Sequence, residues 1–144
     1  SGICGLIGVR DLLGLKTEII GAGAAKAPAT ALSFAAGHPV NASSAKTFAD
    51  GVATREPNAE AIARICRGAS RMVEVTEDEI AQAMRAYFDD THQVAEGAGA
   101  VPLAALLQEQ RRMAGKNVAV VLSGGNIERT RYLQVLGGMT PPVA

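Results

Sequence analysis

Residues 117–126, NVAVVLSGGN, contain the stretch that decides the fold. The continuous apolar run 118–122 predicts a β-strand over 117–122 that is covered on both faces, as strands of a parallel sheet are. Ser123, two glycines and Asn126 follow directly. Ligands of parallel α/β sheets bind beyond the carboxyl ends of the strands, and glycine lets a ligand approach the backbone. This turn is therefore a candidate binding site; the alternative is an ordinary strand-to-helix turn.

Helical and strand patterns alternate through the rest of the chain. Helices are predicted over 4–15, 27–37, 58–69, 77–89 and 101–113, and strands over 17–21, 71–75 and 117–122. This alternation predicts an α/β fold with three layers, a parallel sheet flanked by helices. A typical sheet has about 5–6 strands, so we expect missing chain or another subunit to complete this one.

Local signals mark several boundaries. Gly37 is suited to end the helix 27–37, and Asn58 is a candidate N-cap of the helix 58–69. Thr76 and Glu79 form a capping box that opens the helix 77–89. Residues 38–57 are predicted to form an irregular loop with a turn at Asp50-Gly51, and loops of this length are often functional. We expect one domain over 1–126, followed by a less regular tail over 127–144.

Composition excludes several classes of function. The 144 residues carry a net charge of zero and only 3% aromatic residues, which argues against nucleic acid as a partner. The chain lacks an apolar run of about 18 residues, so we expect no membrane span. Two cysteines, Cys4 and Cys66, are typical of reduced thiols in a cytoplasmic protein.

The first five residues, SGICG, precede the first predicted helix. Gly2 and Gly5 would leave backbone N–H groups accessible at a helix N-terminus, which favours an anion and most often a phosphate. The alternative is a tight loop that binds nothing.

A second glycine pattern, Gly21-x-Gly23, follows the strand 17–21. It fits a dinucleotide-binding fingerprint poorly. Lys26 stands where that pattern has its last glycine or alanine, and no strand ending in an acidic residue follows about 20 residues later.

Two further segments carry acidic residues that are candidates for a site. AEGAGA, residues 95–100, is predicted to be a glycine-rich turn before a helix. Glu96 there could orient a ring or an amine, or complement the helix N-terminus electrostatically. Asp89, Asp90 and His92 do not form a metal coordination sphere by themselves.

Five motifs follow one another along the chain in an order that resembles that of a known enzyme family. The motifs are, in order, SGICG (1–5), TFADGVA (47–53), VTEDEI (75–80), AEGAGA (95–100) and VLSGGN (121–126). In this order the chain closely resembles, over 1–126, the C-terminal portion of the serine/threonine dehydratase family. These are fold type II pyridoxal-phosphate enzymes that include threonine ammonia-lyases and serine racemases.

The resemblance implies roles for particular residues. Ser123 would hydrogen-bond the pyridine nitrogen of pyridoxal 5'-phosphate, with Glu96, Gly124 and Asn126 beside the cofactor. The loop that binds the cofactor phosphate would consist of Ser1, Gly2, Ile3, Cys4 and Gly5, where many relatives have four glycines. Asp50 and Gly51 would border the substrate.

Two departures from the family pattern matter. Some relatives bind a divalent cation through acids where this chain has Gly23 and Ala29, so we expect no metal. The family's Schiff-base lysine lies in an N-terminal SxKxRGA motif, which this sequence lacks. That lysine is both the covalent anchor and the base, so we expect no catalytic residue in this chain and no turnover by it alone.

The resemblance therefore implies part of an ammonia-lyase that converts L-threonine or L-serine to a 2-oxo acid. The N-terminal half of the same enzyme would be a partner, and a homo-oligomer is expected. A serine racemase-like enzyme and a non-catalytic binding or interaction module are the alternatives.

Overall fold

The computed structural model describes residues 2–143. Its two strands, β1 (Ile20–Ala24) and β2 (Arg71–Val75), form a parallel pair in which Ile20 lies opposite Arg71 and Ala24 opposite Val75. The helices are α1 (Gly2–Leu12), α2 (Ala29–Ala36), α3 (Ala59–Gly68), α4 (Glu77–Thr91), α5 (Gly97–Gln108), α6 (Gln110–Met113) and α7 (Arg129–Leu136), with a 3-10 turn η1 (Asp50–Val52).

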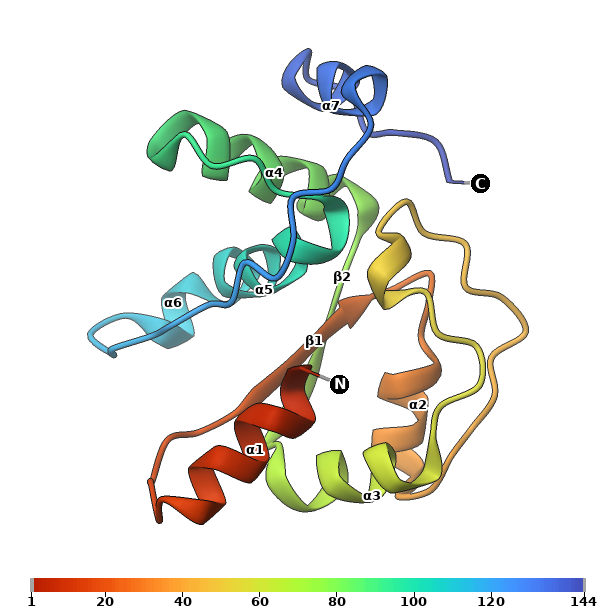
Figure 1. The fold of residues 1–144 in the computed structure, drawn as a ribbon, viewed down its shortest axis with the longest axis vertical. Helices are drawn as coiled ribbons and strands as arrows, with labels where there is room; N and C mark the ends of the chain where they lie inside the picture. Colours follow the sequence, from red (N-terminus) through yellow and green to blue (C-terminus); the bar gives the residue numbers. More distant parts are fainter. Residues whose placement is uncertain (1, 144) are drawn as a thin grey trace.

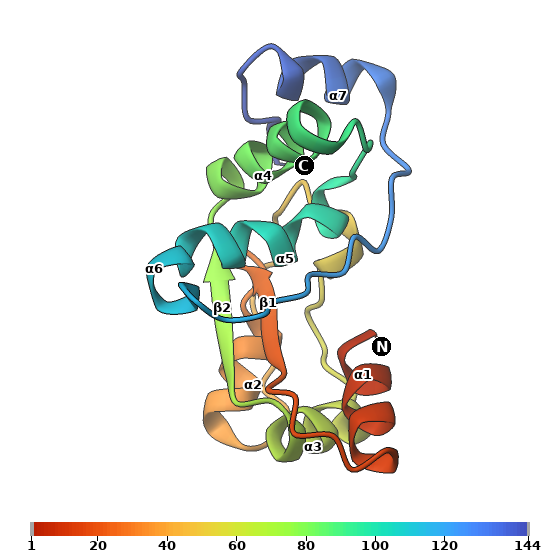
Figure 2. The ribbon, with the colours of Figure 1, turned by 90° about the vertical axis from the view of Figure 1, so that its left-hand side faces the viewer.

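The elements form three layers (Figure 1). Helix α5 covers one face of the strand pair, and α2 packs on the opposite side (Figure 2). Helix α4 packs on α5, and α3 packs against both α2 and α1. The predicted α/β arrangement of helices around a parallel sheet is therefore confirmed.

Capping residues fix the helix boundaries as predicted. The Asn58 side chain accepts the backbone N–H of Ala61 (3.0 Å) at the start of α3. Thr76 and Glu79 form both halves of the capping box of α4. Gly37 ends α2 in the left-handed conformation, with φ 75°, which glycine adopts without a Cβ penalty.

The predicted turn at 95–100 is wrong, because α5 already begins at Gly97. Its first turn, residues 97–100, is buried and consists only of glycine and alanine. Side chains this small let the backbone of α5 approach its neighbours closely. The core joins this helix to β1, β2 and α4 through side chains such as Val75, Ile80, Met84 and Val101.

The predicted strand over 117–122 is also wrong. Residues 117–128, between the turn after α6 and the start of α7, have no regular secondary structure and are drawn in blue in Figure 2. Val118 and Val121 are 44% and 50% exposed. A strand exists only where another strand takes its backbone hydrogen bonds. Among residues 2–143, only β1 and β2 pair, so this segment lacks the neighbour that its sequence anticipates.

The tail is more regular than predicted, since α7 occupies its centre. Val135 on α7 is fully buried in the core, and its carbonyl accepts a hydrogen bond from Arg85 Nη1 of α4 (3.2 Å).

Cys4 and Cys66 are free thiols, as predicted. None of the helices in the described part of the chain has the length and apolar character needed to cross a membrane.

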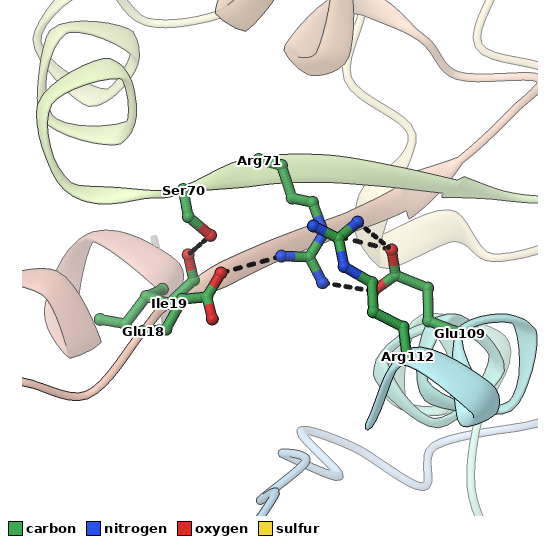
Figure 3. Close-up of polar contacts among 6 residues, drawn as sticks. All are labelled: Glu18, Ile19, Ser70, Arg71, Glu109 and Arg112. Atoms are coloured by element: carbon green, nitrogen blue, oxygen red, sulfur yellow. Dashed lines mark hydrogen bonds and ion pairs between the residues drawn. The ribbon is translucent and has the colours of Figure 1, made fainter. Parts of the chain in front are cut away.

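An ion-pair network ties the amino ends of the strands together (Figure 3). Arg71 donates to Glu109 Oε1 (3.1 Å) and to Glu18 Oε1 (2.9 Å), and Arg112 lies 3.4 Å from the same Glu109 oxygen. The hydrogen bonds from Arg71 hold the pKa of Glu109 below its usual value, and the positive charges of Arg71 and Arg112 add to this effect.

Replacing Glu109 with Gln tests this network. A carboxylate with a lowered pKa in the folded state stabilises that state above its unfolded pKa, and loses the effect as the pH falls through the folded pKa. We expect Glu109→Gln to lower the free energy of unfolding at pH 7 by at most about 1 kcal/mol, as for other ion pairs near the surface. The difference from the wild type should shrink as the pH falls below about 4. Urea denaturation followed by circular dichroism measures it; a difference that grows on acidification would contradict the assignment.

Candidate functional site

Glu96 organises the candidate site from the N-cap position of α5. Its backbone N–H donates to the carbonyl of Gly124 (3.1 Å), and its carboxylate Oε2 accepts the backbone N–H of Asn126 (3.1 Å). One residue therefore holds both ends of the 124–126 turn at the start of α5. The hydrogen bond from the amide of Asn126 to Oε2 orients the carboxylate.

Two glycines make this close approach possible. A Cβ at Gly124 would lie 2.5 Å from Glu96 Oε1, so any side chain there would displace the carboxylate. A Cβ at Gly99 would collide with the carbonyl oxygen of Gly124 and would lie 3.1 Å from the backbone nitrogen of Gly124. The glycines of the SGGN turn therefore allow close contacts with Glu96 and α5 of the same chain. The expected approach of a ligand to this backbone stays a prediction.

The loop before α3 reaches the same place. A Cβ at Gly51 would lie 2.8 Å from Ala98 Cβ and 3.9 Å from Glu96 Oε1. Asp50 is exposed beside it, 3.7 Å from Arg131 Nη1 of α7. The structure therefore brings together the sequence-predicted residues Glu96, Gly124, Asn126 and the Asp50-Gly51 turn.

Ser123 lies exposed at the start of the SGGN turn. It does not stand at the end of a strand, because the segment before it is coil. A serine hydroxyl can donate one hydrogen bond and accept others.

The predicted phosphate loop is the first turn of α1, apart from Ser1, which lies outside the described residues. Ile3 packs toward β1, since a Cβ at Gly21 would lie 3.1 Å from its Cδ1. Cys4 Sγ points to the carbonyl of Ala61 on α3 (3.7 Å). No hydrogen bond among residues 2–143 joins this turn to the Glu96 cluster.

The exposed side of this turn suits an anion. A Cβ at Gly2 or Gly5 would meet no described atom within 4 Å, and the first turn contains no acidic side chain. The first N–H groups of an α-helix have no partner within the helix and carry partial positive charge. A helix N-terminus of this kind can bind an anion such as a phosphate.

No metal centre emerges within residues 2–143, where no three His, Cys, Asp or Glu side chains cluster as metal ligands would. His92 instead ends α4 in the left-handed conformation, with φ 57°. Gly21 and Gly23 lie inside β1, where they pair with Met72 and Glu74. They therefore do not form the turn after a strand that a dinucleotide fingerprint needs.

The sequence patterns missed three residues that shape the site. The glycine pattern predicts a turn at Gly97 and Gly99, yet both lie buried in α5. Phe48 belongs to the predicted loop, but it is buried against Gly97: a Cβ at Gly97 would lie 2.9 Å from its ring. The G-x-G spacing after Glu96 was the available signal for a close helix contact.

Comparison with known proteins agrees with this architecture. An L-threonine ammonia-lyase from Geobacter sulfurreducens is 42% identical over 112 residues, which are 77% of this chain and 28% of that protein. The processed form of threonine deaminase isoform 2 from Solanum lycopersicum superposes with a TM-score of 0.85 at 29% identity, covering 94% of this chain and 40% of that one. Maize serine racemase shares the fold, with a TM-score of 0.81 at 22% identity.

The chain thus spans between about a quarter and a half of the length of these relatives. The predicted fold class, a parallel sheet with flanking helices of the fold type II kind, is confirmed by these neighbours. Residues 1–124 match the family described as pyridoxal-phosphate dependent enzyme. With that match covering most of its length and the fold in agreement, the chain belongs to the family of pyridoxal-phosphate dependent enzymes.

Proposed function

We propose that this chain is the cofactor-binding part of an ammonia-lyase that converts L-threonine or L-serine to a 2-oxo acid and ammonia. The observation that carries the proposal is the double attachment of the SGGN turn to Glu96. It presents Ser123 beside a fixed, hydrogen-bonded turn in a chain whose relatives include proteins named L-threonine ammonia-lyase.

The residues present fit pyridoxal phosphate. The open side of Gly2 and Gly5 and the free amides of the first turn of α1 would hold the phosphate, in the absence of acidic side chains that would repel it. Ile3 and Cys4 do not obstruct that side, since they point toward β1 and α3. Ser1 completes the proposed loop.

When bound, pyridoxal phosphate supplies an electron sink for negative charge at the α-carbon of an amino acid. Ser123 would hydrogen-bond the ring nitrogen, and a neutral hydroxyl leaves that nitrogen largely unprotonated. Glu96 would lie beside the ring, while its Oε2 stays on the amide of Asn126. The Asp50-Gly51 turn, held beside Glu96, would border the substrate.

We further propose that the anchoring lysine comes from the N-terminal half of the same enzyme, within a homo-oligomer. The four lysines of this chain are all exposed, and none lies in an SxKxRGA motif. They are Lys16, Lys26, Lys46 and Lys116. The free thiols of Cys4 and Cys66 agree with a cytoplasmic location.

Lyase chemistry is preferred to racemase chemistry. The maize serine racemase shares the fold, but Gly23 and Ala29 offer no carboxylate where some relatives bind a divalent cation. We therefore propose that neither position binds a metal.

Borohydride reduction tests whether the lysine that binds the cofactor covalently lies outside this chain. The chain is incubated with pyridoxal phosphate, any Schiff base is reduced with borohydride, and the mass of the intact protein is measured by mass spectrometry. The measurement is then repeated with the N-terminal part of the Geobacter sulfurreducens relative, ending before the matched region. We expect no single-site adduct on this chain alone, and 2-oxo acid from L-threonine once both parts are present. A stoichiometric adduct on one lysine of this chain would contradict the proposal. Cofactor retention without turnover in the assembled pair would favour a non-catalytic binding module.

Adding one methyl group to Gly99 tests the role of the SGGN turn. In Gly99→Ala the new Cβ meets backbone of Gly124, which cannot move aside as a flexible side chain can. We expect the dissociation constant for pyridoxal phosphate in the assembled pair to rise about tenfold or more, as an overpacking cost of about 1–3 kcal/mol implies. An absorbance titration measures it.

Gly23→Ala is the matched control, because its Cβ would meet open space. It should bind the cofactor as the wild type does. Equal weakening by both substitutions would show that the contact between Gly99 and Gly124 has no special part in binding.

A further inference from the structure

Glu77, in the first turn of α4, is buried yet points away from its own helix cap. It is 6% exposed, and its Oε2 accepts both the hydroxyl of Thr47 (3.1 Å) and the backbone N–H of Phe48 (3.0 Å). The capping box of the same helix uses Thr76 and Glu79 instead. Helix capping therefore does not account for Glu77, whose partners lie about 30 residues earlier in the chain.

The segment held by Glu77 is itself buried and internally fixed. Thr47 Oγ1 also accepts the backbone N–H of Ala49 (3.1 Å). Thr47, Phe48 and Ala49 are each less than 5% exposed. A single carboxylate thus satisfies two donors of a loop that lacks regular backbone pairing. Leaving such donors unpaired in the interior costs about 1–3 kcal/mol each.

This segment packs directly on the start of α5. At Gly97 a Cβ would lie 2.9 Å from the Phe48 ring and 3.0 Å from Ala49 Cα. Gly97 follows Glu96, the residue that holds the SGGN turn. The contacts therefore run without interruption from Glu77, through the loop, to the first turn of α5 and Glu96.

We infer that Glu77 is a positioning residue for the cofactor site: it holds residues 47–49 against α5 and so fixes Glu96 and the SGGN turn. The inference rests on the proposed function only where cofactor binding is concerned. The mechanical link from Glu77 to the amide of Asn126 can be tested without a cofactor.

A purely structural role for Glu77 would act differently. An acid in the first turn of a helix stabilises it through the helix dipole, and its loss would weaken α4 as a whole. Thr76→Ala supplies this comparison, because it removes the cap of α4 and leaves the bonds of Glu77 to Thr47 and Phe48 in place.

Glu77→Gln should preserve the link. Its single carbonyl oxygen can accept from both Thr47 and Phe48, and its amide group would replace Oε1, which has no hydrogen-bond partner within the described residues. Glu77→Ala removes the acceptor altogether. Thr47→Val and Thr47→Ser provide a second pair, which loses or keeps the hydroxyl.

Amide hydrogen exchange by NMR on the full chain is the first readout. In Glu77→Ala and Thr47→Val we expect exchange at Phe48 and at Asn126 to rise about tenfold, as local opening of one unit implies. It should stay near the wild-type rate in Glu77→Gln, Thr47→Ser and Thr76→Ala. The amide of Ile65, which is buried in the middle of α3, reports on global stability and should not change.

Two exchange results would overturn the inference. Fast exchange at Phe48 with unchanged exchange at Asn126 would mean that Glu77 holds the loop but not the site. Equal acceleration at Ile65 would mean general destabilisation. If Glu77→Ala does not fold, Thr47→Val against Thr47→Ser decides between the same outcomes.

Titration with pyridoxal phosphate, with the N-terminal part of the Geobacter sulfurreducens relative present, is the second readout. Glu77→Ala should raise the dissociation constant about tenfold, and Glu77→Gln should restore it. Unchanged affinity in Glu77→Ala would overturn the inference. Failure of the wild type to bind would instead count against the proposed function, and the exchange data would still decide the link.

Discussion

The close contact between the first turn of α5 and its surroundings is the constraint on which the site depends. Four consecutive small residues, 97–100, are buried there, and the chain comes within van der Waals distance of them from two directions. On one side lies the loop with Phe48 and Gly51; on the other lies the SGGN turn. Glu96 stands at the junction and supplies the polar bonds that small residues cannot.

Sequence patterns were sufficient wherever the structure is local. The strand 71–75, the capping box at Thr76 and the glycine that ends α2 were all predicted, because each depends on residues within a few positions. The grouping of Glu96 with the SGGN turn and the Asp50-Gly51 turn came from the family resemblance. Nothing in the spacing of these residues specifies that they meet.

Long-range requirements explain the errors. The apolar run before Ser123 has the composition of a buried strand, but a strand also needs a partner, and the two strands of the described chain pair with each other. The first turn of α5 looked like a flexible turn because glycine is a poor helix former. Burial against Phe48 and Gly124 offsets that propensity. The role of Glu77 was invisible for the same reason, since its partners lie about 30 residues away.

The most direct test of the account removes the bond between Glu96 and Asn126. The dissociation constant for pyridoxal phosphate would be measured for the wild type, Glu96→Gln and Glu96→Ala, each assembled with the N-terminal part of the Geobacter sulfurreducens relative. Gln retains an oxygen for the amide of Asn126, whereas Ala does not. The account predicts affinity about tenfold weaker in Glu96→Ala and largely restored in Glu96→Gln. Wild-type affinity in Glu96→Ala would contradict it.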